Sequence, residues 1–156
     1  MRKLLLFSGL LLLILTANGQ TSSRKRAKKF VKQGICGTVV EKRGNHMPTV
    51  DKPAPAGQPV EREVLIYAVL KTDQVTMSED GFYSNLPAQP VKTARTDKRG
   101  KFCIYGLPTG TYSVLVRESK GLYANLFDID GRINPVTVKK QKVASVTVEI
   151  SHGAVF

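Results

Sequence analysis

The sequence contains no tryptophan, only two histidines and two cysteines, and half as many acidic as basic residues. The absence of tryptophan weakens sugar binding as an interpretation, because carbohydrate platforms usually stack sugars on flat aromatic rings. The two histidines, His46 and His152, do not have the spacing of a zinc motif. After residue 16, no apolar run reaches the roughly 20 residues that a membrane-spanning helix needs.

The motifs of common catalytic sites are also missing. The sequence has no Gly-x-Ser-x-Gly turn, no pair of carboxylates on a predicted helix and no glycine-rich phosphate loop. We therefore expect no enzymatic activity, no cofactor and no bound metal. Asp128, Asp130 and Asn134 form a weak calcium-like pattern, since hard cations prefer clustered oxygen ligands. The remaining acidic or amide ligand and the closing glutamate of a full EF-type loop are absent, so an Asp-Gly turn is the simpler interpretation.

The N-terminus has the layout of a secretory signal peptide. Arg2 and Lys3 precede an apolar stretch over residues 4–16, and Ala17-Asn18-Gly19 places small residues where a cleavage site requires them. The apolar stretch of about 13 residues is shorter than a membrane span of roughly 20, which favours cleavage over a retained anchor. We expect residues 1–19 to be removed and the protein to be exported, to the periplasm, the cell surface or the medium.

The segment that follows, residues 20–33, is expected to be basic and flexible. It can touch anionic membrane surfaces or acidic glycans, although a solvated linker is the simpler interpretation. Membrane contact is expected only through this segment or the signal peptide. Nucleic acid is not an expected partner, because the protein is exported and has no nucleic-acid recognition motif. The clustered basic residues are Arg24, Lys25, Arg26, Lys28, Lys29 and Lys32.

The rest of the chain, residues 34–156, predicts a single all-β domain. Short runs rich in Val, Ile, Thr and Tyr alternate between apolar and polar positions, and Gly, Pro, Asn and Asp separate them. This alternation places one face of each strand in a core and the other in solvent. The seven predicted strands cover about residues 34–42, 63–71, 91–96, 101–105, 111–118, 135–139 and 143–151.

Three connections are long, at residues 44–59, 72–90 and 119–134, and long loops in compact domains are often functional. Successive connections of an antiparallel sandwich alternate between its two ends, so the first, third and fifth share one end. If the domain has a binding site, we expect it there, although a polar loop end without a ligand is the alternative. This candidate binding end comprises His46, Arg99, Tyr123, Asn125, Asp128 and Asp130.

The order of the turns resembles that of a known family. Residues 37–40 (Gly-Thr-Val-Val) open the domain and residues 57–60 (Gly-Gln-Pro-Val) precede the second strand. Residues 96–102 (Thr-Asp-Lys-Arg-Gly-Lys-Phe) and 106–114 (Gly-Leu-Pro-Thr-Gly-Thr-Tyr-Ser-Val) form the most specific block. The chain resembles the carboxypeptidase regulatory-like domain, which shares its prealbumin-like sandwich with transthyretin. The resemblance covers about residues 34–150 and implies a Greek-key β-sandwich of about seven antiparallel strands.

The resemblance implies no catalytic activity. The hydrolase branch of this fold needs a pocket with His and Arg and a Tyr-Arg-Gly-Ser ending, whereas this chain ends His-Gly-Ala-Val-Phe. Residues 143–150 contain no asparagine, so the internal Lys–Asn crosslink of related adhesin repeats is not expected. The long connections depart from the family's short loops and look like a recurring form in exported bacterial proteins.

We therefore expect a non-catalytic accessory or protein-interaction module of the cell envelope, with another envelope or surface protein as its partner. The alternative is a module that binds a glycan or a peptide. Exposed apolar residues on the loops favour a protein partner, whereas tyrosines lining one groove favour a sugar.

Cys36 and Cys103 are each flanked by residues expected to face inward, so both thiols are expected on the outer face of their strands. The resembled fold places the first and fourth strands side by side, which lets the two cysteines form a disulfide, as is common in exported proteins. Free thiols are the alternative, because a one-residue slip turns a side chain to the opposite face.

The first testable prediction concerns processing. The exported protein is expected to begin near Gln20, because Ala17 and Gly19 satisfy the small-residue requirement of the cleavage site. The intact mass of the exported protein measures this directly. A membrane-bound species that retains residues 1–19 would contradict the prediction.

Overall fold

The computed structural model describes residues 32–48, 51, 53 and 55–156, so the predicted signal peptide and nearly all of the basic segment lie outside the described residues. Apart from one short 3-10 turn, η1 (Thr72–Gln74), the regular structure described is entirely β. Within this part of the chain, no helix is long and apolar enough to cross a membrane. The strands are β1 (Gly34–Asn45), β2 (Gln58–Pro59), β3 (Glu63–Ala68), β4 (Thr76–Met77), β5 (Phe82–Ser84), β6 (Lys92–Arg95), β7 (Lys101–Tyr105), β8 (Gly110–Glu118), β9 (Gly121–Tyr123), β10 (Pro135–Val138) and β11 (Val143–Val155).

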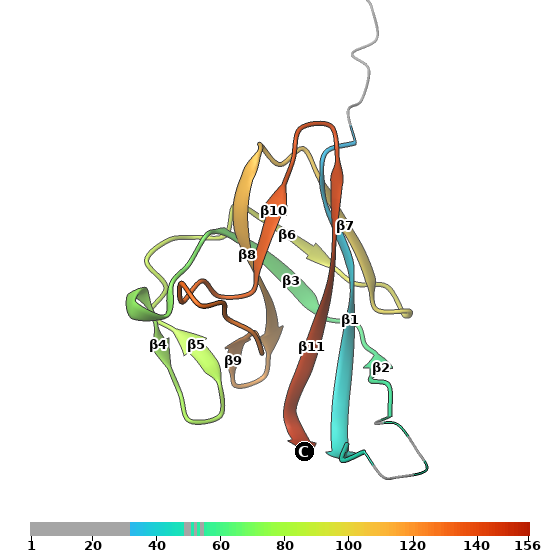
Figure 1. The fold of residues 1–156 in the computed structure, drawn as a ribbon. Helices are drawn as coiled ribbons and strands as arrows, with labels where there is room; N and C mark the ends of the chain where they lie inside the picture. Colours follow the sequence, from blue (N-terminus) through green and yellow to red (C-terminus); the bar gives the residue numbers. More distant parts are fainter. Residues whose placement is uncertain (1–31, 49–50, 52, 54) are drawn as a thin grey trace, which may run out of the picture.

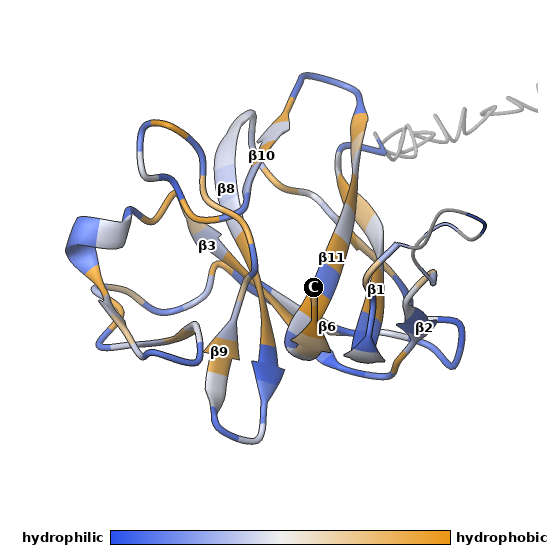
Figure 2. Ribbon diagram, turned by 60° about the horizontal axis from the view of Figure 1, so that its bottom comes forward, coloured by the Kyte–Doolittle hydropathy of each residue, from blue (hydrophilic) through white to orange (hydrophobic). Residues whose placement is uncertain are grey.

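The strands form two sheets that pack as a sandwich (Figures 1 and 2). The smaller sheet has the order β11-β1-β2, and β7 also pairs with β1. The larger sheet has the order β4-β5-β9-β8-β3-β6, and β10 also pairs with β8. The predicted all-β sandwich is confirmed. The core between the sheets consists of alternating apolar side chains, among them Ile35, Val39, Val64, Ile66, Phe102, Ile104, Val114, Val116, Val148 and Ile150.

Each of the seven predicted strands is present, but the pairing is not antiparallel throughout. β1 and β11 run parallel, from Gly34 opposite Val143 to Glu41 opposite Ile150, and β11 extends four residues beyond its predicted end at residue 151. Among the described strand pairs, this one is the parallel exception to the predicted antiparallel pairing. A parallel pair needs a crossover between its two strands, and here the whole intervening domain provides it.

The second and third long connections add strands that the sequence analysis did not predict. Phe82 and Tyr83 of β5 pair with Tyr123 and Leu122 of β9, which extends the larger sheet beyond β8. Other apolar residues of these connections, including Val75, Leu86 and Ile133, pack on the outer face of that sheet. A second apolar cluster forms beneath them, from Leu65, Tyr67, Leu70, Tyr83, Leu115, Leu122, Ala124 and Ile133. Burial on both faces explains why β3 reads as a continuous apolar run rather than an alternating one.

Two turns fix the block that carries the family resemblance. Asp97 Oδ1 accepts hydrogen bonds from the amides of Arg99 and Lys101, each 2.8 Å long. Gly100 has a φ of 69°, and a Cβ atom there would lie 2.3 Å from the carbonyl oxygen of Val39, so only glycine fits. In the next turn, the Tyr112 hydroxyl donates to the carbonyl of Pro108 at 2.9 Å. The Gly100 contact brings the start of β7 close to β1, and the Tyr112 bond closes the turn between β7 and β8.

The two cysteines lie directly opposite each other in this antiparallel β1–β7 pair. The register places Cys36 beside Cys103, and a disulfide joins them on the outer face of the smaller sheet. Their neighbours Ile35, Phe102 and Ile104 point inward and are buried. The bond closes a long loop, because 67 positions separate the two residues.

Removal of this bond is expected to destabilise the domain. In the Cys36→Ala/Cys103→Ala variant the unfolded chain regains the entropy of a loop of this length, which corresponds to a loss of up to about 4 kcal/mol. Urea unfolding of the variant and the wild type, each without reductant, measures the difference. Titration of the denatured, unreduced wild type should find no reactive thiol, and two thiols per chain would contradict the bond.

Candidate functional site

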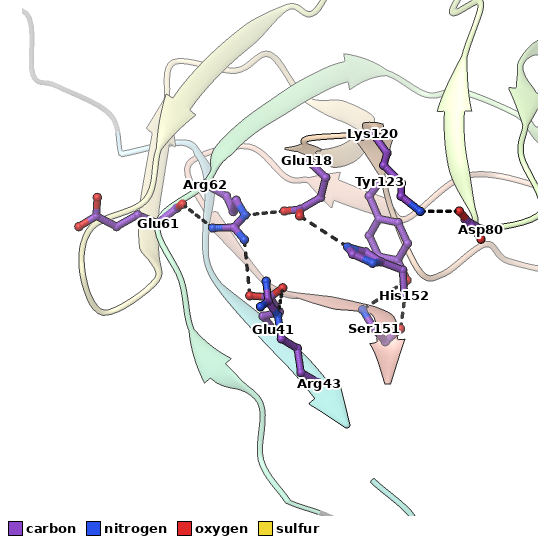
Figure 3. Close-up of polar contacts among 10 residues, drawn as sticks. All are labelled: Glu41, Arg43, Glu61, Arg62, Asp80, Glu118, Lys120, Tyr123, Ser151 and His152. Carbon is purple, nitrogen blue, oxygen red and sulfur yellow. Dashed lines mark hydrogen bonds and ion pairs between the residues drawn. The ribbon is translucent and has the colours of Figure 1, made fainter. Parts of the chain in front are cut away.

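A cluster of charged side chains joins the two sheets at the end of the sandwich where β1 and β11 terminate (Figure 3). Arg62, which precedes β3, lies between two carboxylates from different sheets. Its Nε donates to Oε1 of Glu118 at the end of β8, and its Nη2 lies 3.5 Å from Oε2 of Glu41 on β1. Both glutamate side chains are more than nine-tenths buried, and the Arg62 side chain is about three-quarters buried.

The strand pattern explains why these side chains point inward. Glu41 follows Ile35, Gly37 and Val39 on the inner face of β1, and Glu118 follows Val114 and Val116 in the same way on β8. Each glutamate therefore occupies the inner-face position that follows the last apolar residue on that face of its strand. At the same level the pairing of β1 with β11 is irregular between Glu41 and Arg43, and such bulges redirect side chains near sheet ends.

The cluster contains balancing charges beyond Arg62. Arg43 Nε lies 2.7 Å from Oε1 of Glu41, although most of the Arg43 side chain is exposed. His152 Nε2 lies 3.5 Å from Oε2 of Glu118. With neutral imidazole, two guanidinium groups balance two carboxylates. Burial of carboxylates is costly unless they are paired, and this pairing satisfies both.

His152 also contacts an aromatic group on the larger sheet. Its ring centroid lies 5.1 Å from that of Phe82 and 5.3 Å from that of Tyr123, and the latter two rings are 5.5 Å apart. The Tyr123 hydroxyl accepts a hydrogen bond from the Ser151 amide and lies 3.1 Å from its Oγ. Beside this group, Lys120 pairs with Asp80 at 2.9 Å. β11 is thus tied to the larger sheet by the hydrogen bonds of Ser151 and the aromatic contacts of His152.

The cluster has one arrangement suited to a metal. Glu41, Glu118 and His152 each offer one ligand atom, and these atoms lie within 4.8 Å of one another. However, Arg62 already supplies a cation to both carboxylates, and a metal ion placed there would have to displace its guanidinium. The geometry therefore favours an ion-pair clasp between the sheets over a metal centre.

The structure distributes the candidate binding end over several places. His46 is buried, with Nδ1 3.1 Å from the carbonyl oxygen of Pro55 and its ring 6.1 Å from that of Phe156. Arg99 is exposed in the turn between β6 and β7, and Tyr123 belongs to the aromatic group. In the described part of the chain, Asp128 and Asp130 are the two candidates that share an ion-pair partner, Arg132.

The aspartates form a turn whose charges are internally satisfied. Arg132 lies 2.7 Å from Asp128 Oδ2 through Nε and 2.9 Å from Asp130 Oδ2 through Nη2. Desolvation raises the pKa of Asp128, but hydrogen bonds from the backbone and side chain of Arg132 outweigh it and hold that pKa below its ordinary value. Asn134 is buried and donates from Nδ2 to the carbonyl of Val114. This arrangement favours the Asp-Gly turn over a calcium site.

Glu41, Arg62 and Glu118 are not among the site residues predicted from the sequence, in which His152 is weighed only as a possible zinc ligand. The signal that could have identified these residues is the alternation of inward- and outward-facing side chains along each predicted strand. When the inner-face pattern of the first, fifth and last predicted strands is extended by one step, it reaches Glu41, Glu118 and His152.

No family model matches this chain, and no significantly similar curated protein or solved structure is found. The described fold is that of a β-sandwich with one parallel strand pair.

Loss of the central guanidinium is expected to destabilise the sandwich. Arg62→Met leaves two buried carboxylates with only the exposed Arg43 and the more distant His152 as partners. We expect a loss of about 2 kcal/mol, below the 3–5 kcal/mol of a fully buried pair because Arg62 is partly exposed. Chemical denaturation at neutral pH measures it.

Arg95→Met is the matched control, since its guanidinium lies 4.0 Å from Glu61 and both side chains are largely exposed. Its effect should stay within about 0.5 kcal/mol. Equal stability of the two variants would show that the cluster does not hold the sheets together.

Proposed function

We propose that this chain is a non-catalytic, exported protein-interaction module of the cell envelope. The observation that carries the proposal is an exposed apolar segment at the tip of the connection between β9 and β10. The exposed fractions of Leu126, Phe127 and Ile129 are 54%, 61% and 103%. Large apolar side chains that gather in solvent on one loop are typical of sites that bind other proteins.

The loop that carries these side chains is firmly held. Arg132 pairs with both aspartates of the turn, and Phe127 forms a β-bridge with Ile133. The amide of Thr72 donates to the carbonyl of Gly131, which ties the loop to η1. A rigid support lowers the entropy lost on binding, so the exposed Phe127 ring is suited to act as an anchor for a partner.

Sugar binding is the less favoured alternative. Four of the five tyrosines, Tyr67, Tyr83, Tyr112 and Tyr123, are buried and lie in the two apolar clusters. Burial raises the pKa of Tyr67 and Tyr83 above the ordinary value, as expected for phenols removed from water. In these positions the rings stabilise the fold and do not form an exposed platform for stacking a sugar.

Two further features support the proposal. The disulfide on the outer face is a bond that persists in oxidising compartments, which agrees with the signal-peptide pattern of the N-terminus. The resemblance to carboxypeptidase regulatory-like domains implies that the first and fourth predicted strands are neighbours, and β1 and β7 pair. On this proposal, the domain presents loops to a partner rather than transforming a substrate.

The loop can be tested by photocrosslinking. A photoreactive phenylalanine at position 127 should crosslink to a discrete envelope protein in intact cells, and Ile129→Ser should reduce that product at least ten-fold. With the partner purified, Phe127→Ser/Ile129→Ser should weaken binding at least ten-fold, because two anchors are truncated. The melting temperature should stay unchanged, since both side chains are exposed.

Val91→Ser is the matched control, because it removes an exposed apolar side chain from the segment before β6. It should leave both crosslinking and affinity unchanged. Equal effects of the loop and control variants would refute the loop as a binding surface.

A further inference from the structure

The smaller sheet has a long edge strand. β11 covers 13 residues and pairs on one side with β1; its other side pairs with no strand among the described residues. Unpaired amide and carbonyl groups along a strand are a template for another extended chain. Natural proteins therefore usually cover a long, flat edge strand, place charged residues on it or bind a partner there.

The backbone of β11 shows which groups are available. The carbonyl of Lys142 accepts from the amide of Gly34, so the backbone groups of even-numbered residues point toward β1 along the regular part of the strand. The amide of Ser151 points the other way and donates to the Tyr123 hydroxyl, which closes the edge at that end. Between these limits, the residues whose backbone groups face away from β1 are Val143, Ser145, Thr147 and Glu149.

The usual protection of an edge strand is largely missing from this stretch, because its one charged residue, Glu149, is paired with Lys42 of β1. β11 contains no proline, lysine or arginine, whereas the edge strand β6 carries Lys92 and Arg95. Ser145 and Thr147 are exposed on the outer face, and the inner-face side chains of Ala144 and Val146 are only partly buried. The open stretch is therefore accessible from the outer face and incompletely covered on the inner one.

A concentration of positive charge lies at the beginning of this edge. Lys139, Lys140 and Lys142 are exposed in the hydrophilic turn between β10 and β11 (Figure 2). None of the three forms an ion pair with another described residue. A chain that aligns with β11 meets this charge at one of its ends.

We infer that the edge over residues 143–149 binds an extended segment of a partner protein by strand addition. Backbone hydrogen bonds to the four outward residues supply affinity, and acidic side chains at the segment's end contact the lysines of the β10–β11 turn. The inference rests on the proposed function in taking the partner to be a polypeptide. It uses a surface separate from the exposed loop, so the two can fail independently.

Hydrogen exchange tests whether the edge is free. In the protein alone, the amides of Ser145 and Thr147 should exchange at least ten-fold faster than those of Ala144 and Val146, which face β1. Slow exchange at all four in the free monomer would mean that the chain covers its own edge. Slow exchange together with a dimeric mass by sedimentation would mean that a second copy covers it. Either result would overturn the inference.

Synthetic peptides test the occupant. The probe is a ten-residue peptide of alternating threonine and valine that carries three acidic residues at one end. Two versions, with the acidic residues at the N- or C-terminus, serve the two possible strand directions. At least one should bind and slow exchange at Ser145 and Thr147. Replacing its acidic residues by lysine should weaken binding at least ten-fold, and failure of both versions to bind would overturn the inference.

N-methylation distinguishes strand addition from other binding modes. Methylating every second amide on the edge that faces β11 should abolish binding, whereas methylating the alternate set should change it less than two-fold. Equal sensitivity of both sets would refute the strand geometry. Lys140→Glu/Lys142→Glu should reverse the charge preference, so that the lysine peptide binds more tightly than the acidic one.

Variants of the protein complete the test. Thr147→Lys should weaken peptide binding at least ten-fold, and Thr93→Lys on β6, also an exposed edge position, should not. Phe127→Ser/Ile129→Ser should bind the peptide normally. Loss of peptide binding in the loop variant but not in Thr147→Lys would transfer the site to the loop and overturn the inference, while leaving the proposed function intact.

Discussion

The smaller sheet depends on the close approach of three strands around the first half of β1. β11 lies on one side and β7 on the other, and Gly37 pairs with Val146 of β11 and with Phe102 of β7. A Cβ atom at this position would be 2.2 Å from the carbonyl oxygen of Val146 and 3.0 Å from the Phe102 ring. The absence of a side chain therefore lets Phe102 fill the core beneath the strand. The disulfide and the ion cluster both depend on the register that this contact sets.

The ion cluster and the apolar core have different roles in the sandwich. Apolar contacts provide most of the driving force for bringing the sheets together, but they tolerate sliding of one sheet over the other. The Arg62 guanidinium is more selective, since it satisfies two buried carboxylates only when Glu41 and Glu118 lie opposite each other. A buried ion pair contributes little net stability compared with apolar residues in its place. Removing only one partner is costly, because it leaves the other charge buried and unpaired. The cluster thus favours one alignment of the two sheets.

Much of the fold could be predicted because the alternation of apolar and polar residues along a strand is a local property of the sequence. It identified seven strands, the inward-facing residues and the outward-facing cysteines. It did not identify the partner of each strand, so the parallel pairing of β1 with β11 was missed. The three-residue strands β5 and β9 are too short to show a period, and their pairing depends on residues far apart in the sequence, such as Phe82 and Tyr123, which are 41 positions apart. The charged clasp was missed for a related reason, since its members come together only through the packing of the sheets.

The parallel pair also has a mechanical consequence. β1 begins near the start of the described chain and β11 ends next to its last residue, at opposite ends of the molecule (Figure 1). A force that separates Lys32 from Phe156 therefore pulls the two strands along their length in opposite directions. Their backbone hydrogen bonds, which extend from Gly34 to Asn45, then share the load together instead of breaking one after another. Even after that pair yields, the disulfide prevents the 67-position loop between the cysteines from lengthening. Such a domain resists tension along its own axis.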